Sequence, residues 1–236
     1  MEGDIFLEQI QLNGLCSKIY KKGDIIVSYW KNNYSSLFLE AGILKMTSDS
    51  AEGTIFNLHH IKGEVLVLST SIFNDKVMCR YNLEVVSDTV KLYFLTADQL
   101  NTFMSNSKSV TMYVINCLQK QLTFLWSKLC DFSLNGKCGA ISGQLLAWVY
   151  LFGKKTIHNE IVIELVTNLQ ELGNSCGIAH VSSVSRLLSD LKKEGVIIIE
   201  RGKIKILNID SLKAKAPKIE EWYFLCEREK WNEINL

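Results

Sequence analysis

The 236-residue sequence contains a single proline and no stretch rich in glycine, serine or proline. A long disordered linker is therefore not expected, and any two domains should be closely apposed. No apolar run approaches the roughly 18 residues of a membrane span. The N-terminus MEGDIFLEQIQ also lacks the basic region and apolar core of a signal peptide. These absences predict a cytoplasmic protein without a membrane partner.

Clusters of catalytic or metal-binding side chains are also missing. The seven cysteines are widely spaced and form no CxxC pair, and there are only four histidines. We therefore expect reduced, mostly buried thiols and no metal site. A phosphate-binding GxxxxGK[ST] loop, a Ser/His/Asp order and paired carboxylates are absent too, which argues against an enzyme. The formal net charge of +1 excludes little, because a nucleic-acid-binding protein needs positive charge on one face only.

Short segments rich in β-branched and aromatic residues fill residues 19–95, and glycines at 23, 42, 53 and 63 separate them. Strands of this length, with turns at roughly ten-residue spacing, predict a β-sandwich or β-barrel. The apolar period changes near residue 96. A short helix is expected over 96–105, with Thr96 or Asp98 as its N-cap.

A longer helix is predicted over 109–131, which contain no glycine or proline. Its apolar side chains recur at steps of three and four residues, the spacing of a coiled-coil seam. The helix could pack on its own β-domain or pair with a second copy in a parallel two-fold dimer, and we favour the dimer. The predicted dimer interface consists of Ile115, Leu118, Leu122, Leu125 and Leu129, with Phe132 continuing the stripe. A turn is expected at Asn135-Gly136-Lys137, and a further helix over 138–152.

Two short helices, over 168–175 and 180–194, flank a break in the stretch LGNSCGIAHVSSVSRLL, and Asn168 or Thr167 is expected to cap the first of them. Gly173 allows the helices to approach closely, and Gly177 can adopt the positive φ that redirects the chain. Small polar residues and Arg186 begin the second helix, which predicts a helix-turn-helix in which Arg186 contacts guanine. The alternative is an ordinary helical hairpin with a solvated basic face. A β-hairpin around Arg201-Gly202 and helix from Ser211 onward follow. The predicted DNA-binding residues are His180, Ser182, Ser183, Arg186, Lys192, Lys193, Arg201 and Lys203.

Several stretches along nearly the whole chain resemble the CRP/FNR family of bacterial transcription regulators, and more closely its PrfA-like branch from Listeria. They are GTIFNLHHIKG, YNLEVVSD, LQKQ, DFSLNGKCGAISGQLL, LQELGNSCGIAHVSSVSR and the AP that precedes EEW. The resemblance implies an α+β fold. It implies three parts. Residues 1–107 are expected to form an N-terminal β-roll sensor domain of the cyclic-nucleotide-binding, jelly-roll type, and residues 108–136 a dimerisation helix and hinge. Residues 137–236 are expected to form a winged helix-turn-helix domain with C-terminal helices. It implies a homodimeric activator that binds a palindromic promoter site, with RNA polymerase as a further partner.

The resemblance also bears on the effector. Gly63-Glu64 is present, but Tyr81 follows Arg80 where cyclic-nucleotide members carry serine or threonine, so cyclic AMP is not expected. Only Cys16 lies where oxygen-sensing members have a cysteine cluster, so an iron–sulfur cluster is not expected. The PrfA-like branch implies glutathione or another small peptide between the two domains, held by Lys62, Lys120, Gln121, Phe152, Trp222 and Cys226.

Two of these positions depart from the branch. Phe152 replaces a tyrosine, and Glu227 replaces a cysteine, with Cys226 displaced by one residue. The effector therefore stays open between glutathione, another small ligand and none. A second function also stays open, namely a small-ligand sensor or interaction module with weak or vestigial DNA binding.

Overall fold

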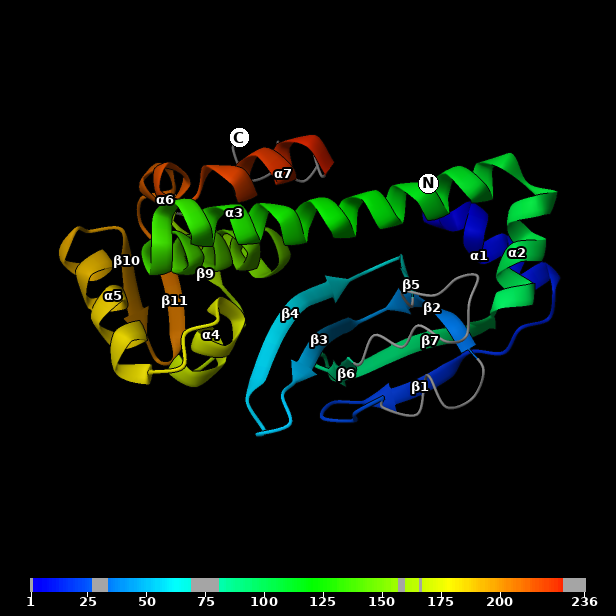
Figure 1. Ribbon diagram of the computed structural model, residues 1–236, viewed down its shortest axis with the longest axis horizontal. Coiled ribbons are helices and arrows are strands. Elements are labelled where there is room, and N and C mark those ends of the chain that lie inside the picture. Colours follow the sequence, from blue (N-terminus) through cyan, green and yellow to red (C-terminus); the bar gives the residue numbers. More distant parts are fainter. Residues whose placement is uncertain (1, 27–33, 69–80, 157–159, 166, 227–236) are drawn as a thin grey trace. The chain divides into compact units, whose positions relative to one another are not determined.

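A computed structural model describes residues 2–26, 34–68, 81–156, 160–165 and 167–226 (Figure 1). The chain folds into two compact units, Met1–Gln121 and Leu122–Leu236. The division falls inside a long helix, so the predicted boundaries at 107/108 and 136/137 stay predictions. No helix in the described ranges is long and apolar enough to cross a membrane.

Seven strands of the first unit form two antiparallel sheets with the orders β1-β7-β2-β5 and β4-β3-β6. Alternating side chains point to opposite faces of each strand. Leu37, Leu39 and Leu92 are fully buried and pack with Leu44 and Leu83 of the other sheet. These contacts make the core of the predicted β-roll. The strands are β1 (Lys18–Lys21), β2 (Tyr34–Ala41), β3 (Ile43–Asp49), β4 (Ile55–Lys62), β5 (Val65–Leu68), β6 (Asn82–Val85) and β7 (Thr89–Thr96).

Helices cover the other face of the β1-β7-β2-β5 sheet. Phe6 of α1 (Glu2–Leu12) is fully buried beside Phe38 and Phe103. Helix α2 (Ala97–Asn106) begins with a capping box, in which Thr96 accepts a hydrogen bond from the backbone N–H of Gln99. The predicted cap and short helix are thus confirmed. Helix α1 was not predicted; the N-terminal residues indicated only that a signal peptide is not expected.

Helix α3 (Lys108–Phe152) continues past its predicted end but breaks at Gly136, where φ is 59° and ψ is −151°. Only glycine adopts this backbone conformation readily. The predicted turn is therefore a break between two helical stretches rather than a loop. The part before the break buries Val110, Tyr113 and Val114 in the first unit, whereas every residue of 139–150 is buried in the second.

The second unit contains a four-stranded antiparallel sheet with the order β10-β11-β9-β8 and four further helices. The predicted helices over 168–175 and 180–194 and the predicted hairpin are confirmed within a residue or two, whereas β8 and β9 were not predicted. The helix predicted from Ser211 onward is two helices, α6 and α7, and its last residues, 227–236, lie outside the described residues. Part of the predicted strand IIVSYW falls in 27–33, outside the described residues. The elements are β8 (Gly153–Lys155), β9 (Ile161–Ile163), α4 (Leu169–Cys176), α5 (Val181–Lys193), β10 (Ile197–Glu200), β11 (Lys203–Ile206), α6 (Ile209–Lys215) and α7 (Pro217–Cys226).

Candidate nucleic-acid interface

Helix α4 is held at both ends by the residues that the sequence pattern singled out. The Oδ1 of Asn168 accepts a hydrogen bond from the backbone N–H of Glu171 at 2.8 Å, which satisfies a free donor of the first turn. Gly177 ends the helix in the left-handed region, with φ of 66° and ψ of 26°. The predicted turn chemistry is therefore confirmed.

Gly173 is the point where α4 approaches the turn and α5. A Cβ atom at this position would lie 2.7 Å from the carbonyl oxygen of Ile178 and 3.3 Å from Cγ2 of Val184. The backbone N–H of Ile178 donates to the carbonyl of Gly173 at 2.9 Å. The absence of a side chain therefore permits the two helices and the turn to pack at this distance.

Helix α5 has one buried face and one solvent face. Val184, Leu188 and Leu191 are buried in the core of the second unit. One hundred degrees of rotation per residue places Ser182, Arg186, Ser189 and Lys193 on the opposite face, and all four are exposed. Small serines around an arginine leave room for a base edge to approach the guanidinium group. His180 precedes the helix and is exposed, whereas Ser183 is half-buried.

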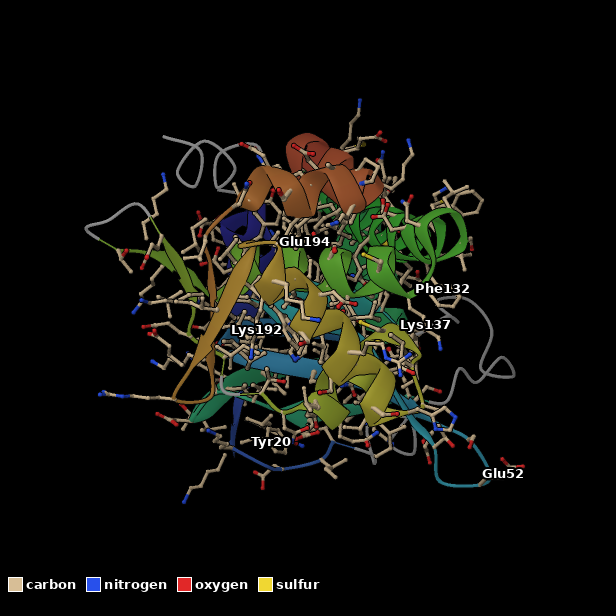
Figure 2. All side chains as sticks on the ribbon, turned by 90° about the vertical axis from the view of Figure 1, so that its left-hand side faces the viewer. Tyr20, Glu52, Phe132, Lys137, Lys192 and Glu194 are labelled. Atoms are coloured by element: carbon tan, nitrogen blue, oxygen red, sulfur yellow. The ribbon has the colours of Figure 1, made fainter. Side chains whose placement is uncertain are left out.

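The hairpin between β10 and β11 turns at Arg201 and Gly202, whose φ values are 50° and 76°. Two consecutive positive φ values are the signature of a type I′ turn, which suits the twist of a two-residue hairpin. Arg201 and Lys203 are exposed at the tip. Figure 2 views the second unit from the side of α5, with Lys192 labelled and the hairpin beside the helix.

The cations of α5 and the hairpin differ in how they are neutralised. In the described part of the chain, no carboxylate forms an ion pair with Arg186, Lys192, Arg201 or Lys203. Lys193 lies 3.8 Å from Asp190, one turn away on an exposed face. Uncompensated positive charge at the helix and at the hairpin tip can bind phosphate groups.

The predicted dimer stripe on α3 is exposed in the single chain. Leu122 and Leu129 expose 69% and 58% of their surface, and Trp126, beside the stripe, exposes 65%. The opposite side of the same helix buries Tyr113, Cys117 and Phe124. Within the first unit, Ile115 and Leu118 of the stripe expose 45% and 39% of their surface while Tyr113 and Cys117 are buried, so there the stripe is not the side by which α3 packs on the β-roll.

The six predicted effector residues divide between the two units. In the first unit, Lys62 ends β4, and Nε2 of Gln121 donates to the carbonyl of Leu66 at 2.9 Å. In the second, Trp222 is only 6% exposed and packs against Phe124, with ring centroids 5.0 Å apart. Lys120 and Phe152 are half-buried, and Cys226 ends α7. Because the residues belong to separately described units, a joint effector site stays a prediction.

Sequence reasoning missed a set of polar groups on α3, of which Asp131 and Gln144 are buried and Lys128 is half-buried. Burial lowers the pKa of Lys128 to about 8, from an ordinary 10.5. Burial likewise raises the pKa of Cys176, at the end of α4, to about 12. Lys128, Asp131 and Gln144 line a cavity of about 10 Å³, the space of a single water molecule. No local pattern marks these residues, because their burial depends on α4 and α7.

The helix-turn-helix region has recognised relatives. Residues 143–215 match the model of the Crp-like helix-turn-helix domain. Over 235 residues, 99% of both chains, the protein is 38% identical to the listeriolysin regulatory protein of Listeria monocytogenes. It is also 28% identical to the lactate racemization regulatory protein of Lactiplantibacillus plantarum, over 74% of this chain and 79% of the relative.

Solved structures share the fold at lower sequence identity. A putative transcriptional regulator of the Crp/Fnr family from Eubacterium rectale has a TM-score of 0.65 at 20% identity, covering 89% of this chain and 94% of the other. A cyclic nucleotide-binding domain containing protein from Listeria monocytogenes has a TM-score of 0.70 at 17% identity, covering 89% and 96%. These matches confirm the predicted α+β fold class. With 38% identity along its whole length to a named regulator, and with this fold, the chain belongs to the CRP/FNR family of transcription regulators.

Proposed function

We propose that this regulator binds a palindromic promoter site as a homodimer and activates transcription together with RNA polymerase in the cytoplasm. The observation that carries the proposal is the solvent face of α5, where Ser182 and Ser189 flank Arg186, which forms no ion pair with any carboxylate of the described residues. An arginine in this setting can donate two hydrogen bonds to O6 and N7 of guanine. Lys192, Lys203 and Arg201 would supply phosphate contacts that fix the register.

The dimer part of the proposal rests on the exposed stripe of α3. Leucines at steps of three and four residues form a seam that a second copy can match across a two-fold axis. Two α5 helices related by such an axis reach successive major grooves about one helical turn apart. The palindromic form of the site follows from this symmetry.

Control by a small effector, glutathione or another small peptide, belongs to the same proposal. Lys62 and Lys120 provide positive charge for a carboxylate, and Trp222 provides an aromatic surface. A ligand can shift the protein toward its DNA-binding form only as far as it binds that form more tightly. Mass spectrometry of small molecules that co-purify with the protein tests this part, and a Lys62→Ala, Lys120→Ala variant should lose the bound ligand.

The DNA-binding part is tested with duplexes selected from a random pool by the full-length protein. The selected duplex should bind on the order of a thousandfold more tightly than random duplex at the same salt concentration. Arg186→Ala should cost about 1–3 kcal/mol on the selected site and relax its base preference. Lys203→Ala should weaken both duplexes equally and reduce the salt slope by about one. Equal affinity of the unchanged protein for both duplexes would instead support a sensor or interaction module.

A further inference from the structure

The solvent face of the β10-β11-β9-β8 sheet carries a row of charged residues behind the hairpin tip. The strand register pairs Lys154 with Val162, Val162 with Lys205, and Lys205 with Ile198, so these four residues share one face. Glu200 and Lys203 are paired two residues nearer the tip and lie on the same face. The opposite face is the buried one, with Ile161, Ile163, Ile204 and Ile206 in the core.

Carboxylates form ion pairs with Lys205 and Lys154 of this face, whereas no carboxylate of the described residues forms one with Arg201 or Lys203 at the tip. The Nζ of Lys205 lies 3.1 Å from Oε2 of Glu160 and 3.5 Å from Oε2 of Glu200. The hydrogen bond to Glu160 and the neighbouring Glu200 raise the pKa of Lys205, so its ammonium stays charged and paired. At the far edge of the sheet, Lys154 lies 2.7 Å from Glu164.

This arrangement limits where the hairpin can bind a phosphate group. A phosphate that approached Lys205 would have to displace two carboxylates and would lie beside their negative charge. Arg201 and Lys203 present no such obstacle among the described residues. Sequence-independent affinity for DNA comes almost entirely from phosphate contacts, each of which releases counterions. Neutralising a lysine that lies within reach of the DNA backbone therefore lowers affinity for random DNA.

We propose that Glu160 and Glu200 are specificity-determining residues, which withhold Lys205 from DNA so that the hairpin binds the backbone only at its tip. The inference rests on the proposed DNA-binding function. In a specific complex, base contacts of α5 fix the register, and the tip reaches the backbone first. A complex with random DNA has no fixed register and can tilt from the tip onto the adjoining surface of the hairpin, so it would gain most from a freed Lys205, which lies two residues from Lys203.

The test measures the affinity of the full-length protein for selected and random duplexes over a range of KCl concentrations. The Glu160→Gln, Glu200→Gln variant should bind random duplex more tightly, with a salt slope steeper by about 0.9 for one added phosphate contact. Its slope on the selected duplex should be unchanged, so the ratio of specific to random affinity falls. Adding Lys205→Gln should restore the original slope, because the gain depends on that lysine and not on net charge alone.

Glu164→Gln is the matched control, because it frees Lys154 on β8, the edge strand farthest from β10 in the sheet order. It should leave both slopes unchanged. An unchanged random-DNA slope in the double variant, or an equal change on both duplexes, would overturn the inference. If the unchanged protein itself does not distinguish the duplexes, the proposed function fails. The two failures are therefore distinguishable.

Discussion

The Oδ2 of Asp131, in α3, accepts a hydrogen bond from the backbone N–H of Ile219, in α7, at 2.9 Å, although the residues are 88 positions apart. Its Oδ1 accepts a second hydrogen bond, from the N–H of Lys218 at 3.1 Å. Pro217 has no N–H, and Ala216 before it has no side-chain acceptor, so α7 cannot cap its own first turn. Asp131 therefore serves as a remote N-cap that fastens α7 to the end of the first stretch of α3.

Removing this cap should weaken the second unit. Asp131→Ala leaves the buried N–H of Ile219 and the part-buried N–H of Lys218 without this acceptor, and we expect the free energy of unfolding to fall by about 1–3 kcal/mol. Chemical denaturation monitored by tryptophan fluorescence measures the change, since Trp222 lies in α7. Glu221→Ala is the control, because Glu221 forms only an exposed ion pair with Lys218 and should matter little. Equal stability of the two variants would contradict the capping role.

The Gly173→Ala variant distinguishes the effect of helix propensity on stability from the effect of packing. In an exposed helix, alanine stabilises by about 1 kcal/mol relative to glycine. Here the added Cβ would lie 2.7 Å from a backbone oxygen, so we expect destabilisation and loss of DNA binding instead. Asn174→Ala, at the next position of α4 and only half-buried, should be tolerated. Thermal denaturation and duplex binding are measured for both, and a stabilised Gly173→Ala variant would show that the close approach is not needed.

Lys128 and Cys176 should give a stability that rises between about pH 8 and pH 9 and then stays level up to about pH 10.5. The folded pKa of Lys128, about 8, lies below its ordinary 10.5, so the unfolded chain binds more protons above pH 8. The free energy of unfolding then rises by at most about 1.4 kcal/mol per pH unit. Above pH 9, the Cys176 thiol ionises first in the unfolded chain, because its folded pKa is about 12, and this opposes the rise.

Denaturation of the protein and of a Lys128→Met variant between pH 7 and 10 isolates the lysine, because all other groups are common to both. The difference between the two free energies should change with pH above 8. A Cys176→Ala variant should continue to gain stability above pH 9, where the unchanged protein does not. Parallel curves for the protein and Lys128→Met would mean that the ammonium is not buried.

Leu122→Lys should convert the proposed dimer into a monomer. The substitution places a charge in the middle of an apolar seam and, across a two-fold axis, opposite its own copy. Analytical ultracentrifugation measures the mass, and DNA affinity should fall with the loss of the second α5. Ser109→Lys adds the same charge to an exposed position on the other side of α3 and should leave the mass unchanged. A dimeric Leu122→Lys variant would place the interface elsewhere.

Most of the confirmed predictions depend on interactions between residues that lie close together in the sequence. Thr96 and Asn168 cap helices through atoms only three residues away, and Gly177 redirects the chain through its own φ. The apolar stripe of α3 and the buried face of α5 follow from a helical period of 3.6 residues. Such features need no knowledge of distant contacts, so they could be located in advance.

The features that were missed depend on partners far along the chain. Strands β8 and β9 have three residues each, too few for a periodic pattern, and are defined by pairing with each other and with β11. Helix α1 is stabilised by burying Phe6 against the sheet and α2.

The sequence by itself determined the helix-turn-helix, its capping residues and the exposed stripe, because each depends on residues that lie close together along the chain. Only the tertiary structure decided which lysines are available to bind the phosphate groups of DNA. Lys203 and Lys205 look alike in the sequence, but among the described residues Glu160 and Glu200 form ion pairs with Lys205 and not with Lys203. It also decided that Asp131 caps α7 and that the half-buried Lys128 has a lowered pKa, since both need segments more than 40 residues away to fold against α3.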